Sequence, residues 1–204
     1  LQTIGQMSCN PAMGGIAKGQ IIREIDALGG YSGIVSDVSA IQFKMLNRSK
    51  GPAMWSPRVQ SDRMMFAQAW RDRLEQTPNL DFYQDMVQDL LFDGDTVTGV
   101  VTSLGLKIHS KTVILTNGTF LNGLIHIGDK NYGGGRAGES ASIGLTATLL
   151  KKGFESGRMT TGTPPRVDGR SLNFDLMEEQ PGDLDPVKFS YSTETKPLTK
   201  QRSC

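Results

Sequence analysis

The hydrophobic positions near the start of the chain repeat with the period of an α-helix. Residues 16–28 place four of them on one helical face, and Gly29-Gly30 follows as a helix stop. These four are Ile21, Ile22, Ile25 and Leu28. The pattern predicts a helix that buries one side against the rest of the protein.

A longer helical pattern covers residues 55–76. Ser56 is a suitable N-cap, Pro57 fits the first turn, and Thr77-Pro78 ends the pattern. The predicted buried stripe consists of Phe66, Ala69, Trp70 and Leu74. A shorter amphipathic segment precedes it at 39–49, and its inward positions are Ile41, Met45 and Leu46.

After residue 79 the pattern changes to the period of β-strands. Residues 80–92 predict one or two strands, the sequence DGD at 93–95 predicts a turn, and 96–104 predicts the partner strand. A short strand and then a buried apolar strand at 112–116 continue the chain. Together these segments predict a β-meander.

The last third of the chain is dominated by glycine-rich and polar segments. A loop at 131–140 leads into a predicted helix at 142–152, which Gly153 closes. From Met159 onward Pro, Gly, Asp, Thr and Ser dominate, and hydrophobic periodicity is poor. This tail is interpreted as ordered loop and short strands leading toward a second domain.

Length and composition narrow the class of protein. The 204 residues suffice for one sizeable domain, or for one and part of another, and the net charge of +1 argues against a strongly basic nucleic-acid module. The two cysteines, at opposite ends of the chain, predict reduced thiols of a cytoplasmic protein. No apolar run approaches the roughly 18–20 residues of a membrane span. The chain begins without Met and in mid-pattern, so we expect it to be an internal piece of a longer protein.

The sequence GGIAKGQ at 14–20 raises the question of a phosphate loop. A Walker loop requires Gly-Lys followed by Ser or Thr, and here Gly19 follows Lys18. The dinucleotide fingerprint G-x-G-x-x-G is also missing from this stretch. Two interpretations of Gly14 and Gly15 stay open. They could form an anion-binding site at the start of a helix, or a turn that is needed only for packing.

Cys9 lies in a loop outside the apolar stripes and, on the predicted elements, just before a helix. A buried structural thiol is the common alternative, whereas a helix N-terminus favours the thiolate form of a nearby cysteine. No histidine or second cysteine is adjacent, so a Cys-His hydrolase and a C-x-x-C redox pair are both poorly supported. The two histidines, His109 and His126, give no readable metal site.

Three further segments carry candidate chemistry. The apolar strand that ends at Asn117-Gly118 would place backbone at the carboxyl edge of a sheet, where α/β folds bind ligands. The loop around Arg136, YGGGRAGE, is a second possible anion seat, or else a flexible surface loop. The basic stretch at 48–73, which includes Arg63, favours a solvated helix face, with binding of an acidic polymer as the alternative.

Eight segments spread over the whole chain point to one family. They are MSCNPAMGGIAKG, EIDALGG, IQFKMLNRSKGPA, RVQSDR, VILTNGTFL, IHIG, YGGGRAGE and TGTPPR. In this order they resemble the glucose-inhibited division protein A family, whose members are FAD-dependent tRNA uridine 5-carboxymethylaminomethyl modification enzymes. So many blocks in register are far more specific than any single glycine motif.

The resemblance implies a partial α/β fold of the two-dinucleotide-binding flavoprotein type, with a β-meander and the start of a second domain. Residues 1–158 would be part of the FAD-binding domain, and 159–204 an extended segment leading into an NADH-binding or insertion domain. The family's G-x-G-x-x-G should precede Leu1. A second family cysteine and the helical C-terminal region should follow Cys204. We therefore expect this piece to be inactive alone.

The resemblance also implies site residues. Cys9 matches a family cysteine proposed to act in catalysis. Val87 matches a position whose backbone reaches the adenine of FAD, and Ser142 matches another FAD-contacting position. Asn117-Gly118-Thr119 matches a step beside the cofactor, and Gly14-Gly15 would turn the chain into a helix beside the same flavin site. No metal ligands are expected.

The implied reaction is the modification of C5 of the wobble uridine of tRNA, uridine 34. FAD and NADH would handle the redox steps, a folate donor would supply one carbon, and glycine or ammonia would supply the nitrogen. The expected partners are tRNA and a tRNA-modification GTPase that joins a homodimer in a heterotetramer, in the cytoplasm and without a membrane. Three alternatives stay open: a folate- and FAD-dependent tRNA uridine methyltransferase, a flavin oxidoreductase for a small molecule, and a non-catalytic docking or tRNA-binding piece.

Overall fold

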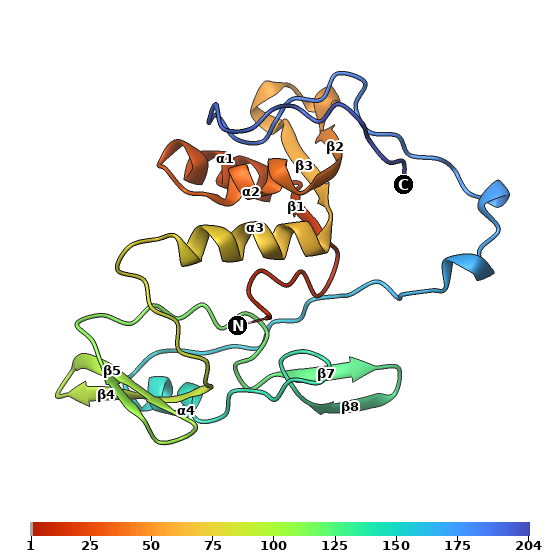
Figure 1. Cartoon of the computed structure of the whole chain (residues 1–204). Helices are drawn as coiled ribbons and strands as arrows, with labels where there is room; N and C mark the ends of the chain where they lie inside the picture. Colours follow the sequence, from red (N-terminus) through yellow and green to blue (C-terminus); the bar gives the residue numbers. More distant parts are fainter. Residues whose placement is uncertain (1) are drawn as a thin grey trace. The chain divides into compact units, whose positions relative to one another are not determined.

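The computed structural model describes residues 2–204 and divides the chain into two compact units (Figure 1). The first unit combines Leu1–Asp81 with Gly162–Cys204, and the second is Phe82–Thr161. The first unit is therefore built from both ends of the chain. The predicted functional division at residue 158 is a different kind of boundary and stays a prediction.

The first unit is built on a three-stranded antiparallel sheet. Its strands are β1 (Ala12–Gly14), β2 (Ala40–Leu46) and β3 (Ser56–Ser61), in the spatial order β1-β3-β2. Val59 of the central strand is opposite Met13 on one side and Phe43 on the other. This register aligns apolar side chains of neighbouring strands, which is how cross-strand pairs stabilise a sheet.

Three helices belong to the same unit: α1 (Lys18–Ala27), α2 (Ser32–Val38) and α3 (Arg63–Glu75). Asp62 caps α3, because its Oδ1 accepts hydrogen bonds from the backbone N–H groups of Met64 at 2.9 Å and Met65 at 3.0 Å. Two short 3₁₀ turns, Arg48–Lys50 and Pro52–Met54, connect β2 to β3.

The core of this unit joins helix, sheet and the C-terminal segment. Ile22 of α1, Phe43 of β2, Val59 of β3 and Phe189 form one buried cluster. Phe189 is fully buried although it belongs to a segment without helix or strand. Burial of each such side chain contributes roughly 1.5–3 kcal/mol, so the core depends on this tail segment.

Two carboxylates fix the tail segment to the helices. Asp37 at the end of α2 accepts hydrogen bonds from the backbone N–H groups of Phe189 at 2.5 Å and Ser190 at 2.9 Å. Asp26 of α1 accepts one from the N–H of Tyr191 at 2.7 Å. Burial raises the pKa of Asp37 above its usual range, although these hydrogen bonds favour its charged form.

The second unit contains a β-meander and a separate hairpin. The meander consists of β4 (Val87–Asp93), β5 (Thr96–Thr102) and β6 (Lys107–His109), and the hairpin of β7 (Leu124–Ile127) and β8 (Lys130–Gly133). Both sheets are antiparallel. Helix α4 (Leu145–Lys151) packs against β4. Two more 3₁₀ turns, Gly169–Ser171 and Phe174–Leu176, lie in the tail of the first unit.

Several predicted elements are confirmed. Helix α1 falls within 16–28 and α4 within 142–152. The hairpin of β4 and β5 turns at the predicted DGD sequence, where Gly94 has a φ of 55°. The helix predicted at 55–76 is confirmed in its second part, which is α3. Of the predicted stripe in α1, however, Ile22 alone is buried.

Four predictions of secondary structure are wrong. Within the segment 39–49, Ala40–Leu46 form strand β2, in which Phe43 is buried and Met45 packs against the core. Residues 56–61 form strand β3, so Asp62 replaces Ser56 as the cap of α3. Segment 112–116 has no strand partner among the described residues, and Ile114 is 86% exposed. The tail after Met159 contains 3₁₀ turns and, among its described residues, no strands. The physical reason is shared: whether a segment forms a strand depends on pairing with distant partners, which the pattern within a short window does not report.

Candidate functional site

Cys9 lies in the loop before β1, and its side chain is exposed. Strand β1 lies between it and α1, so the expectation that Cys9 directly precedes a helix is wrong. Its Sγ is instead 3.6 Å from the carbonyl oxygen of Gly162, a sulfur hydrogen-bond contact. The thiol is therefore accessible from solvent and held against a segment 153 residues further along the chain.

Two arginines converge on the backbone of the Cys9 loop. Nη2 of Arg166 donates hydrogen bonds to the carbonyl oxygens of Ser8 at 2.6 Å and Cys9 at 3.3 Å. Nη2 of Arg63, the first residue of α3, donates to the Cys9 carbonyl at 3.3 Å. Neither arginine stands out in the sequence as a member of one site with Cys9. Arg63 looked like part of a solvated helix face, and Arg166 appeared only within the segment TGTPPR.

The glycines at 14 and 15 have structural roles of their own. Gly14 has a φ of 84°, and a Cβ there would lie 2.2 Å from the carbonyl oxygen of Pro57 and 2.9 Å from the Phe189 ring. The N–H of Gly15 donates to the Pro57 carbonyl at 2.9 Å. These contacts directly support the interpretation that Gly14 and Gly15 are needed for packing. A role of these glycines beside a flavin stays a prediction.

The remaining predicted site residues gather in the second unit. Ser142 is buried, and its Oγ donates to the carbonyl oxygen of Val87 at 2.7 Å. Its N–H donates to the carbonyl of Phe120 at 2.8 Å. The structure thus joins Val87 and Ser142, which lie 55 residues apart in the sequence, through one hydrogen bond.

The Asn117-Gly118-Thr119 step is a turn that adjoins Ser142. The N–H of Phe120 donates to the Asn117 carbonyl at 3.0 Å, and Gly118 has a φ of 53°. Thr119 Oγ1 donates to the carbonyl of Gly135 at 2.5 Å. Because Phe120 also accepts from Ser142, the three predicted FAD-contacting positions form one connected cluster.

The glycine-rich loop around Arg136 lies beside this cluster. Arg136 forms an ion pair with Glu139 at 3.1 Å, and its guanidinium lies 5.6 Å from the centre of the Phe120 ring. A Cβ at Gly135 would overlap the same ring at 2.2 Å, so this glycine allows the aromatic contact. Arg136, the cation of the predicted anion-binding loop, is therefore already paired within the protein, with Glu139 and the Phe120 ring.

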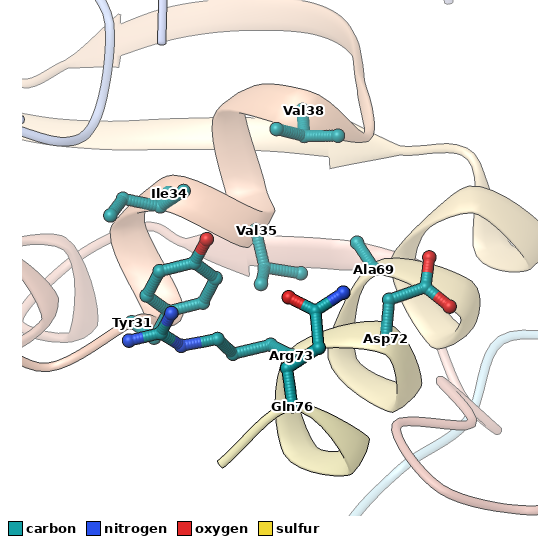
Figure 2. A pocket seen from close by; sticks show the side chains of 8 residues that line it. All are labelled: Tyr31, Ile34, Val35, Val38, Ala69, Asp72, Arg73 and Gln76. Atoms are coloured by element: carbon teal, nitrogen blue, oxygen red, sulfur yellow. The ribbon is translucent and has the colours of Figure 1, made fainter. Parts of the chain in front are cut away.

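A separate cavity of about 210 Å³ lies between α2 and α3 of the first unit. Figure 2 shows the Arg73 side chain reaching across it to the face of Tyr31, with Cζ 4.3 Å from the ring centre. Tyr31 also packs edge-on against Trp70, with ring centres 6.3 Å apart. Apart from Arg73, at the end of the basic stretch 48–73, no residue predicted from the sequence as a site residue lines this cavity.

Residues 2–204 show neither a metal-binding cluster nor a membrane-spanning helix. The described part of the chain contains no group of three or more His, Cys, Asp or Glu side chains placed to hold a metal ion. None of its helices combines the length and apolar character needed to cross a membrane.

The chain combines helices with antiparallel sheets and superposes on a solved GidA structure over 99% of its length. These two findings define it as part of an α/β FAD-binding fold. The glucose inhibited division protein A family model matches residues 1–204, and the chain belongs to that family.

Relatives and a solved structure agree with this assignment. The proteins named tRNA uridine 5-carboxymethylaminomethyl modification enzyme MnmG from Christiangramia forsetii and Flavobacterium johnsoniae are 74% and 73% identical to it over 204 residues. Each match covers 100% of this chain and 33% of the relative. The crystal structure of Aquifex aeolicus GidA (form II crystal) is 45% identical and superposes with a TM-score of 0.90, covering 99% of this chain and 34% of that one. The chain thus spans about a third of the length of these relatives.

Proposed function

We propose that this chain is part of an enzyme that adds a carboxymethylaminomethyl, or aminomethyl, group to C5 of the wobble uridine of tRNA. The relatives that match it over its whole length carry the name of that activity. The observation that carries the proposal within the molecule is an exposed cysteine held by two arginines from distant segments. Because the chain spans a third of these relatives, we expect activity from the longer protein.

Cys9 is the proposed nucleophile. Addition of its thiolate to C6 of the uridine moves the C5=C6 electron pair to C5, which makes C5 nucleophilic. C5 then bonds to the methylene carbon of the folate donor, held as an iminium, whose C=N electron pair moves to nitrogen. The nitrogen of glycine or ammonia replaces the folate nitrogen on that carbon and loses a proton, and the folate leaves as the amine. Loss of the C5 proton to a base restores the C5=C6 double bond as the Cys9 thiolate leaves. The exposure of Cys9 agrees with this role, because a nucleotide base must reach the sulfur.

FAD is the proposed cofactor, and the second unit supports it. Val87, Ser142 and the Asn117-Gly118-Thr119 turn would hold it, and hydrogen bonds through Ser142 and Phe120 bring these positions together in one place. FAD supplies a carrier for two electrons. Of these residues, Gly118 leaves open space where a Cβ would be, so backbone can approach a ligand closely there.

NADH as reductant, a folate one-carbon donor and a partner GTPase complete the proposal. They follow from the family resemblance, as do the homodimer, the heterotetramer and the cytoplasmic location. This piece is small and its net charge is only +1, whereas tRNA binding needs many positive charges. We therefore expect other parts of the longer protein to make most of the tRNA contacts.

The test uses a chimera in which this chain replaces the matching 204 residues of the Christiangramia forsetii relative. In that protein, Cys9→Ser should keep flavin absorbance and thermal stability and abolish tRNA modification. Cys204→Ser is the matched control, because Cys204 is the other exposed cysteine and should tolerate the change. Modification is measured by mass spectrometry of nucleosides from digested tRNA. Undiminished modification by Cys9→Ser would refute the nucleophile, and a 5-methyluridine product would favour the methyltransferase alternative.

A further inference from the structure

The loop that carries Cys9 has few constraints of its own. It lies outside helix and strand, and the Cys9 side chain is exposed. A loop of this kind samples many backbone conformations unless distant groups hold it. A nucleophile must instead be presented to its target atom with sub-ångström precision. The groups that restrain this loop therefore bear directly on the proposed reaction.

Arg166 is the principal restraint. One nitrogen, Nη2, bridges the consecutive carbonyls of Ser8 and Cys9 at 2.6 and 3.3 Å. A hydrogen bond from a charged donor contributes roughly twice as much as one between neutral groups. Pro164-Pro165 precede Arg166 and restrict the backbone that presents it.

Arg63 reaches the same carbonyl from helix α3, 54 residues after Cys9 in the chain. It is the first residue of α3, where Asp62 caps the helix and donates its own N–H to the Ser39 carbonyl at 2.7 Å. Its Nη2 lies 3.3 Å from the Cys9 carbonyl. Two guanidinium groups on restrained backbones thus share one oxygen atom of the Cys9 peptide.

We propose that Arg166, assisted by Arg63, is a positioning residue that holds the Cys9 thiol in the orientation required for attack on the tRNA base. The Gly162 carbonyl, four residues before Arg166, accepts the sulfur contact, so the segment 162–166 restrains both the backbone and the side chain of Cys9. This inference rests on the proposed function, because it assigns the arginines to the nucleophile of that reaction.

Arg166→Ala in the chimeric protein tests the proposal. We expect kcat for tRNA modification to fall about 10- to 100-fold, because an ångström-scale misplacement of a reacting group costs on that order. KM for tRNA should stay within about twofold, since the arginine acts on the bound complex. Arg166→Lys keeps the charge and one donor direction and should recover part of the loss, as should added methylguanidinium with Arg166→Ala.

Arg170→Ala is the matched control. It removes the same charge four residues further along the chain, and the Arg170 side chain, which is 92% exposed, pairs with Asp168. It should leave kcat unchanged. Arg71→Ala is the equivalent control for Arg63→Ala, because Arg71 is also in α3 and pairs with Glu75.

Hydrogen–deuterium exchange gives a readout that needs no activity. Arg166→Ala should raise exchange in peptides covering residues 6–12, and Arg170→Ala should not. Unchanged exchange there, an unchanged kcat, or a rise in KM alone would overturn the proposal; the last would assign Arg166 to RNA binding. A wild-type chimera that modifies no tRNA would refute the proposed function, while the exchange measurement would still decide whether Arg166 holds the loop. If Arg166→Ala does not fold, Arg166→Lys and Arg63→Ala carry both measurements.

Discussion

Replacing Phe189 with alanine should destabilise the first unit strongly. Phe189 is 0% exposed and packs in one cluster with Ile22, Phe43 and Val59, although it lies in a segment without regular structure. Truncation of a buried Phe costs about 3–5 kcal/mol, because the transfer free energy is lost and a cavity remains. A domain is stable by only about 5–15 kcal/mol, so this one change should remove a large fraction of the total.

The free energy of unfolding is measured by urea denaturation of the chain, followed by circular dichroism. Phe174→Ala is the matched control, because Phe174 belongs to the same tail and is 64% exposed. It should change the free energy of unfolding by less than about 0.5 kcal/mol. Equal effects of the two substitutions would refute the reasoning, since they would mean that the tail contributes no core residue.

Two smaller perturbations test the local physical chemistry of each unit. Asp62→Ala should cost about 1 kcal/mol, because the two N–H groups that Asp62 caps at the start of α3 lose their acceptor; the same urea titration measures it, and a change near zero would contradict the cap. In the second unit, hydrogen bonds, foremost from the Ser103 hydroxyl, lower the pKa of Asp85 from 3.8 to about 2. Because the folded pKa is the lower one, the stabilisation from Asp85 is present above about pH 4 and is lost as the pH falls toward 2. Carbon-13 NMR titration should show this pKa, and Ser103→Ala should raise it; an identical titration curve in the variant would assign the shift to another cause.

Sequence reasoning worked where local signals agree with the final fold. The hairpin of β4 and β5 follows from two β-rich runs around a DGD turn, whose glycine adopts the positive φ that such turns require. Helix α4 follows from periodicity and a glycine stop, and Gly153 has a φ of 85°. The signals that predict these elements lie within the elements themselves and the turns that bound them.

Prediction from local sequence patterns fails where pairing with a distant segment overrides the pattern. Residues 40–46 read as an amphipathic segment with helical spacing, yet they form a strand because Val59 lies opposite Phe43 and the pair packs on Ile22 and Phe189. Pro57 is compatible both with the first turn of a helix and with the start of a strand, and here it lies near the start of β3. Only the packing of the core distinguishes these alternatives.

The residues alone sufficed to establish the family and to single out Cys9, because both depend on the identity and order of side chains along the chain. They did not show that Arg63 and Arg166 meet at Cys9. Arg166 lies 157 positions from Cys9, and the hydrogen bond between them forms only when both ends of the chain fold into one unit. No periodicity or spacing encodes such a contact, because chain folding, and not sequence distance, brings the two segments together.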